Sequence, residues 1–177
     1  MIQIFLRSID ALCRASAWLA AITLAVMGLL GMVEILSRWW FNHSLQFAFE
    51  YSAYMLAFIM FGGSAWALKE GGHIRVNLIM QPLGPVARRA VDMVATVFAL
   101  GISTYLSIAS VRFTARTYEL GSVSYFPSET PLAWPQTAFT FGLCLLTLAL
   151  LARLIRLVIG EATESDIDKK NLEEASL

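Results

Sequence analysis

Three ionisable residues flank two apolar segments at spacings that allow them to act together. Glu34 and Arg38 are four residues apart, in the acid-then-base order that favours an ion pair on one face of a helix. Glu50 opens the next apolar segment, and we expect it in the first turn of a helix, where a negative charge suits the helix dipole. This cluster suits helix capping at a membrane surface. Contact with a partner subunit and a lining for substrate or proton entry are the alternatives.

A second polar cluster, LKEGGHIRVNLI at residues 68–79, interrupts the apolar sequence abruptly. A haem site would need two axial ligands at similar depth, and His43 and His73 are expected on opposite sides of the membrane. No His, Cys or carboxylate cluster has the spacing of metal ligands. No GxSxG, HExxH or phosphate-loop motif is present either. We therefore expect no catalytic residue, no cofactor and no metal, and we interpret the chain as a non-enzyme.

The composition predicts a membrane protein. Hydrophobic residues make up 58% of the 177 residues and charged residues 15%, whereas soluble domains carry about 25% charged residues. The mean hydropathy is +0.65. The 13 basic and 13 acidic side chains cancel, so no nucleic-acid partner is indicated.

Four stretches free of charged residues are each long enough to cross a bilayer core of about 30 Å as a helix. They predict an all-α membrane protein, with a four-helix transmembrane domain at residues 1–160 and a polar cytoplasmic tail at 161–177. Pro85 suits the start of the third helix and Gly121 its end. The spans are expected at about 13–38, 48–68, 86–119 and 130–158.

The distribution of basic residues predicts the orientation of the chain. With four spans, one side of the membrane receives only Arg38, Arg112 and Arg116, and the other side receives all remaining lysines and arginines. Because basic residues concentrate on the cytoplasmic side of membrane proteins, both termini are expected in the cytoplasm.

The connection between the second and third spans predicts a further element. Gly72 permits a sharp turn, and the mixed apolar and polar residues 73–82 suit an amphipathic interfacial arm helix. Candidates for contact with lipid phosphates near this arm are Arg75, Arg88 and Arg89.

Small residues in the first two spans allow helices to approach closely. They are Gly28, Gly31, Gly62, Gly63 and Ser64. We interpret them mainly as packing positions within the bundle, with contact to another membrane protein as the alternative.

The stretch from Glu50 to Ile79 resembles the small membrane subunit of tripartite ATP-independent periplasmic (TRAP) transporters, the DctQ-like family. It contains FGGSAWAL, which includes Gly62, and then GGHIRVNLI, which includes Gly72 and His73. A span ending near an arginine, a short outer loop and an acidic residue at the next span complete the pattern. The resemblance covers the four-span layout from residue 1 to about residue 160.

The resemblance implies an accessory subunit of the bacterial inner membrane. It would pack as a fixed scaffold against a large, DctM-like membrane subunit that carries the substrate and sodium sites and works by an elevator-type motion. A periplasmic binding protein would deliver an organic acid to this pair, and phospholipids would surround it. The residues expected at partner or lipid interfaces are Arg38, Glu50, Gly62, Gly72, His73, Arg75, Arg88 and Arg89.

Two other functions remain open from the sequence. An independent small transporter or channel, assembled as an oligomer, would rely on Glu34 as its acidic residue. A membrane enzyme or redox subunit would bind a coloured cofactor such as haem, and we expect a colourless preparation instead.

Overall fold

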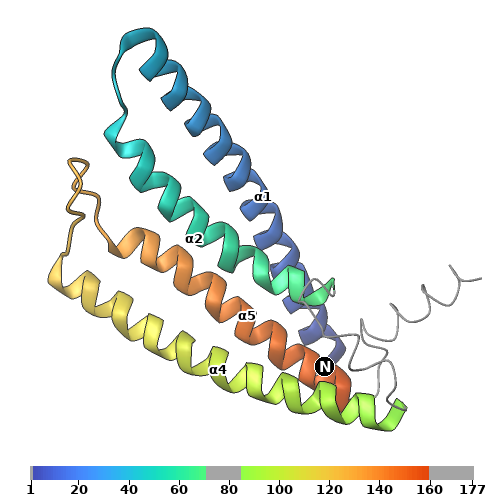
Figure 1. Ribbon diagram of the computed structural model, residues 1–177. Coiled ribbons are helices and arrows are strands. Elements are labelled where there is room, and N and C mark those ends of the chain that lie inside the picture. Colours follow the sequence, from blue (N-terminus) through green and yellow to red (C-terminus); the bar gives the residue numbers. More distant parts are fainter. Residues whose placement is uncertain (1, 71–84, 160–177) are drawn as a thin grey trace, which may run out of the picture.

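The computed structural model describes residues 2–70 and 85–159 of the chain, and four long helices make up most of this part (Figure 1). The helices are α1 (Ile2–Phe41), α2 (Gln46–Lys69), α4 (Pro85–Leu120) and α5 (Ala133–Ile159). Each is long and apolar enough to cross a membrane. This confirms the predicted all-α class with four membrane-spanning helices. The arm expected at 73–82 and the tail expected at 161–177 lie outside the described residues.

The ends of α4 follow the breaker residues in its sequence. The helix begins at Pro85 and ends just before Gly121, as predicted. Gly121 has a φ of +59° and donates its N–H to the carbonyl of Tyr118 at 3.2 Å, a left-handed ending that glycine adopts without strain. At 1.5 Å per residue, the 36 residues of α4 extend over roughly 54 Å. The helix must therefore tilt or project, because a bilayer core is only about 30 Å thick.

The helices lie side by side in the order α1, α2, α5, α4 (Figure 1). The central element is α5, which packs against both α2 and α4, and the first part of α1 also reaches it. The main apolar core forms where α1, α2 and α5 meet, and it includes the buried residues Cys13, Ala65 and Leu145. α1 and α4 therefore lie at the two edges of the arrangement and keep much of their surface uncovered.

The backbones of α2 and α5 approach each other at Gly142. A Cβ atom there would lie 2.6 Å from the carbonyl carbon of Phe61 and 2.7 Å from the backbone nitrogen of Gly62, so only glycine fits. α1 also contacts this part of α2, because the Ser16 hydroxyl donates to the carbonyl of Gly62 at 2.7 Å. The role predicted for Gly62 in packing within the bundle is confirmed.

Gly28 and Gly31 behave differently. Within the described residues, and apart from the adjacent residues and local backbone of α1 itself, no atom lies within 4 Å of a Cβ built at either position. The interpretation of these two glycines as packing positions within the bundle is therefore wrong. They lie in the second half of α1, which contacts α2 but leaves most of its circumference uncovered.

The two ends of the bundle contain different elements (Figure 1). One end, which we call the loop end, carries the short loop 42–45 and the long loop 121–132. The other, which we call the terminal end, brings the beginning of α1 to the end of α5. An ion pair between Asp10 and Arg156 joins these segments at 2.7 Å.

Candidate functional site

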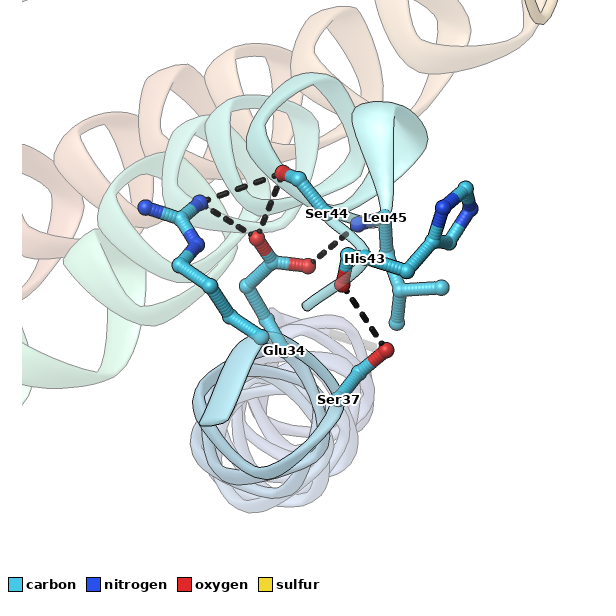
Figure 2. A network of polar contacts seen from close by, with 6 residues as sticks. Glu34, Ser37, His43, Ser44 and Leu45 are labelled. Carbon is cyan, nitrogen blue, oxygen red and sulfur yellow. Dashed lines mark hydrogen bonds and ion pairs between the residues drawn. The ribbon is translucent and has the colours of Figure 1, made fainter. Parts of the chain in front are cut away.

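At the loop end, Glu34 joins α1 to the start of α2 (Figure 2). Its Oε1 accepts hydrogen bonds from Arg38 Nη2 at 2.6 Å and Ser44 Oγ at 2.8 Å. Its Oε2 accepts the backbone N–H of Leu45 at 2.7 Å. Leu45 is the N-cap residue of α2 and has no side-chain cap of its own, so Glu34 supplies an acceptor from the neighbouring helix. The predicted ion pair with Arg38 is confirmed, and both carboxylate oxygens accept hydrogen bonds from groups of this chain.

His43 joins the same loop through its backbone. Its carbonyl accepts the hydroxyl of Ser37 at 3.0 Å, and its imidazole points away from Glu34 (Figure 2). Asn42, directly before it, has a φ of 51°, a conformation that asparagine tolerates better than most residues. The histidine therefore helps to shape the turn without bringing its ring to the carboxylate.

Glu50 is the key contact between α2 and the long loop 121–132. Its side chain is only 2% exposed, and its carboxylate accepts hydrogen bonds from the hydroxyls of Tyr54 and Ser128, the first at 2.6 Å. The Thr130 hydroxyl donates to Ser128 at 3.1 Å and lies 3.3 Å from the hydroxyl of Tyr51. A buried charge is tolerated only when hydrogen bonds compensate its lost hydration, so Glu50 and the loop depend on each other.

The position expected for Glu50 was wrong by about one turn. Helix α2 begins at Gln46, and no acidic residue lies in its first turn. The Glu50 carboxylate therefore binds the long loop and does not interact with the first turn of α2. Its partners Ser128 and Thr130 were not identified from the sequence, because they are separated from Glu50 by almost eighty residues.

The long loop has its own backbone order. Val123 and Pro131 form an isolated antiparallel bridge, and Ser124 donates its N–H to the carbonyl of Thr130 at 2.9 Å. The loop turns back on itself in this way and presents Tyr125 to solvent, fully exposed. Phe126 packs near Phe49 of α2, with 6.2 Å between ring centroids. The long loop is thus held in a defined conformation at the loop end by its backbone bridge and by its contact with α2.

A row of hydroxyl side chains joins α4 to α5, and it was missed in the sequence. The Thr147 hydroxyl lies 2.7 Å from Ser103 and 2.8 Å from Ser107. About two helical turns closer to the loop end, the Thr140 hydroxyl lies 2.6 Å from that of Ser110 and 3.0 Å from that of Thr114. The signal was present in the spacing, since serines and threonines recur every three or four residues along α4 and so share one face. Such hydroxyl pairs hold helices together inside membranes.

Ion pairs fasten the helices at the terminal end. Asp10 of α1 pairs with Arg156 of α5 at 2.7 Å and with Lys69 of α2 at 3.3 Å. Arg153 of α5 lies 3.7 Å from Asp92 of α4. All four helices are thereby connected through charged side chains at this end.

The residues expected at partner or lipid interfaces fall into three groups. Arg38 is 66% exposed at its side chain, whereas Glu50 and Gly62 contact other parts of the chain. Arg89 donates its Nη2 to the carbonyl of Leu157 at 2.5 Å, and so serves the α4–α5 contact. The remaining candidates lie outside the described side chains: Gly72, His73, Arg75 and Arg88.

The described ranges 2–70 and 85–159 contain no candidate metal site. No group of three or more His, Cys, Asp or Glu side chains in this part of the chain is arranged to hold a metal ion. A cavity between Cys13 and Arg153 has a volume of about 10 Å³, which is about the space of one water molecule. The polar side chains described above contact each other between helices and loops, and these contacts hold the described elements together.

Comparison with known proteins gives a consistent set of matches. The family model described as "Tripartite ATP-independent periplasmic transporters, DctQ component" matches residues 27–160. The chain is 27% identical over 119 residues to the ectoine TRAP transporter small permease protein TeaB of Halomonas elongata, an alignment covering 67% of this chain and 62% of that protein. It thus spans less than two thirds of that relative's length. No solved structure matches the chain.

A second relative aligns over more of both chains. It is the C4-dicarboxylate TRAP transporter small permease protein DctQ of Vibrio cholerae, 25% identical over 190 aligned residues. The alignment covers 89% of this chain and 82% of that protein. Both relatives are transporter subunits by name, and neither name describes an enzyme.

Proposed function

The chain belongs to the DctQ family of TRAP transporter components, the small permease subunits, and from this premise we propose that it is the fixed scaffold subunit of a sodium-coupled uptake system. It packs against a large, DctM-like membrane subunit that performs the elevator-type movement. A periplasmic binding protein delivers the substrate to this pair. The substrate names of the two relatives, ectoine and C4-dicarboxylate, support an organic acid as the substrate here.

The observation that carries the proposal is the apolar surface that α1 and α4 leave uncovered. On the second half of α1, Leu29, Met32 and Ile35 are between 62% and 68% exposed. On α4, Phe98 is 70% exposed and Ile102 61%. A helix at the edge of a membrane protein is covered either by lipid or by another protein, and both α1 and α4 have room for a partner.

Gly28 and Gly31 favour α1 as the partner-facing edge. Both have open space above their Cα atoms within the described structure, and they lie about one turn apart, whereas α4 has a single such position, Gly101. Paired small residues let a second helix approach closely in a membrane. Lipid chains do not need such positions. We therefore place the large subunit along the second half of α1.

The polar groups of the described spans support a static role. The carboxylate of Glu34 holds the start of α2, that of Glu50 holds the long loop, and the Thr147 hydroxyl joins α4 to α5. Transport residues must exchange partners during a cycle, whereas these side chains already have partners within the chain. The runner-up function, an independent oligomeric transporter using Glu34, is disfavoured for this reason.

The charge distribution supports a cytoplasmic terminal end in the bacterial inner membrane. Arg7, Arg14, Lys69, Arg153 and Arg156 lie at this end, and positive charge concentrates on the cytoplasmic side. The loop end would then face the periplasm. There the long loop, with its exposed Tyr125, and the nearby ends of α1 and α2 are placed to help dock the binding protein.

Copurification tests the proposed partnership. The tagged chain is expressed together with the large, DctM-like membrane subunit proposed as its partner and extracted in a mild detergent. We expect the two proteins to copurify in fixed proportion, and we expect a bulky Gly31→Trp variant to release the large subunit while the chain stays folded. A Gly101→Trp variant on α4 is the matched control, since Gly101 also has open space around it. Retention of the large subunit by Gly31→Trp, or its release by Gly101→Trp, would contradict the proposed placement on α1.

A further inference from the structure

A positively charged groove lies beside the beginning of α1, at the terminal end. It has a volume of about 470 Å³, and its lining includes Arg7, Asp10, Arg14, Trp18 and Lys69. The first four come from α1 at intervals of three or four residues, so they lie along one side of that helix. Lys69, the last residue of α2, closes the groove from the neighbouring helix.

The groove has more positive than negative charge. Asp10, the acidic residue in its lining, already pairs with Arg156 at 2.7 Å and Lys69 at 3.3 Å. Neither Arg7 nor Arg14 forms an ion pair with a carboxylate in the described part of the chain. The exposed arginines and the shared carboxylate therefore leave a net positive site that is open to an anion.

Two of the cations are brought together by an aromatic ring. The guanidinium carbon of Arg14 lies 5.7 Å from the centroid of the Trp66 ring, and Lys69 Nζ lies 5.2 Å from the same centroid. Cation–π contacts of this kind hold both side chains in place. Like charges held close together repel each other, and a bound anion between them would relieve that repulsion.

The surface that continues from the groove is apolar. Trp18 is 67% exposed, and one turn further along the same side of α1 comes Ile22, 57% exposed. An amphipathic ring such as that of tryptophan is favoured where a membrane changes from polar to apolar. A phosphate at the arginines would therefore have an apolar path for attached acyl chains directly beside it.

We propose that this groove binds the headgroup of an anionic phospholipid, with Arg7 and Arg14 on its phosphate and an acyl chain along Trp18 and Ile22. Guanidinium groups match phosphate oxygens in pairs, and basic sites between membrane helices select anionic headgroups. A free anion would use the cations but would have no use for the apolar path. The inference goes beyond the proposed transport role and does not depend on it.

Native mass spectrometry of the full chain tests this site. The protein is purified in detergent, stripped of lipid and titrated with phosphatidylglycerol, with phosphatidylcholine and inorganic phosphate in parallel. The double variant Arg7→Gln with Arg14→Gln should weaken the tightest phosphatidylglycerol binding about 30-fold, because each cation near a headgroup contributes ~1 kcal/mol and 1.4 kcal/mol is tenfold. The matched control changes Arg112 and Arg116, two exposed arginines at the loop end, to glutamine, and it should bind within twofold of the unaltered chain.

Three results would contradict the proposed lipid site. Equal losses in the two double variants would mean a general effect of net charge. Equal binding of phosphatidylcholine would remove the headgroup selectivity, and displacement by equimolar inorganic phosphate would point to a free anion. Replacing Arg7 and Arg14 by lysine keeps the charge but loses the paired guanidinium bonds, so the binding should fall clearly less than with glutamine. A loss as large as with glutamine, or a changed helix content of the glutamine variant, would indicate a structural role for these arginines instead.

Discussion

Gly142→Ala is the substitution that tests the packing of α2 against α5 most sharply. The added Cβ would lie 2.6 Å from the carbonyl carbon of Phe61, whereas carbon atoms in contact are usually about 3.5–4.0 Å apart. The obstacle is backbone, so no side-chain rotation can relieve it, and the two helices must separate locally by about 1 Å. Overpacking of this kind costs about 1–3 kcal/mol.

A gain in helix propensity partly hides this cost. Replacing glycine by alanine inside a helix stabilises it by about 0.5–1 kcal/mol. Gly101→Ala on α4 provides the correction, because a Cβ at that position meets nothing within 4 Å in the described structure. The difference between the two variants isolates the clash, and we expect Gly142→Ala to be less stable than Gly101→Ala by about 1–3 kcal/mol.

The assay is reversible unfolding of the purified chain in mixed detergent micelles, followed by loss of helical circular dichroism. A weaker α2–α5 contact should also reduce crosslinking between cysteines introduced on the two helices. The reasoning would be refuted if the free energies of unfolding of the two variants agreed within about 0.5 kcal/mol, because a backbone clash cannot be that cheap.

Three further substitutions test the polar contacts. Thr147→Val removes the hydroxyl shared by two α4 serines and should lower the free energy of unfolding by about 1–2 kcal/mol. The reason is that hydrogen bonds between helices in membranes average about 0.6 kcal/mol each, with a maximum near 1.7. An unchanged midpoint in the same unfolding assay would contradict this prediction. Glu50→Gln removes the buried charge and should accelerate hydrogen exchange at the Ser124 amide, whose hydrogen bond closes the long loop, by 10-fold or more. The reason is that hydrogen bonds to charged groups contribute about 1.5–3 kcal/mol. Unchanged protection of this amide would show that the loop keeps its conformation without the carboxylate. Asp10→Asn leaves Lys69 and Arg156 without their shared carboxylate. It should lower the free energy of unfolding by about 1–3 kcal/mol, between the values for exposed and buried ion pairs. The unfolding assay at low and high salt measures this loss, and equal stability of the variant would rule out a structural role for Asp10.

The sequence predicted the helices well because a bilayer allows few other structures. Stretches free of charge indicated four helices long and apolar enough to cross a membrane, and Pro85 and Gly121 marked the ends of α4. These signals are local, since they depend on the chemistry of a residue and its near neighbours. The Glu34–Arg38 pair was predictable for the same reason, being one helical turn apart.

The packing of the helices was much harder to predict. In a membrane protein, surfaces that face lipid and surfaces that face another helix are both apolar, so composition does not separate them. Gly28 and Gly142 are both glycines within apolar stretches, yet one has open space and the other touches the backbone of α2. The partnership of Glu50 with Ser128 required the long loop to fold back over α2, which no local pattern indicates.

The most direct test of the scaffold role is substrate uptake by purified subunits in liposomes with a sodium gradient and the periplasmic binding protein outside. The small chain, the large subunit and the two together are reconstituted separately. We predict accumulation of an organic acid only when both subunits are present, and none with the small chain alone. Uptake by the small chain alone, abolished by Glu34→Gln, would contradict the account and favour an independent transporter.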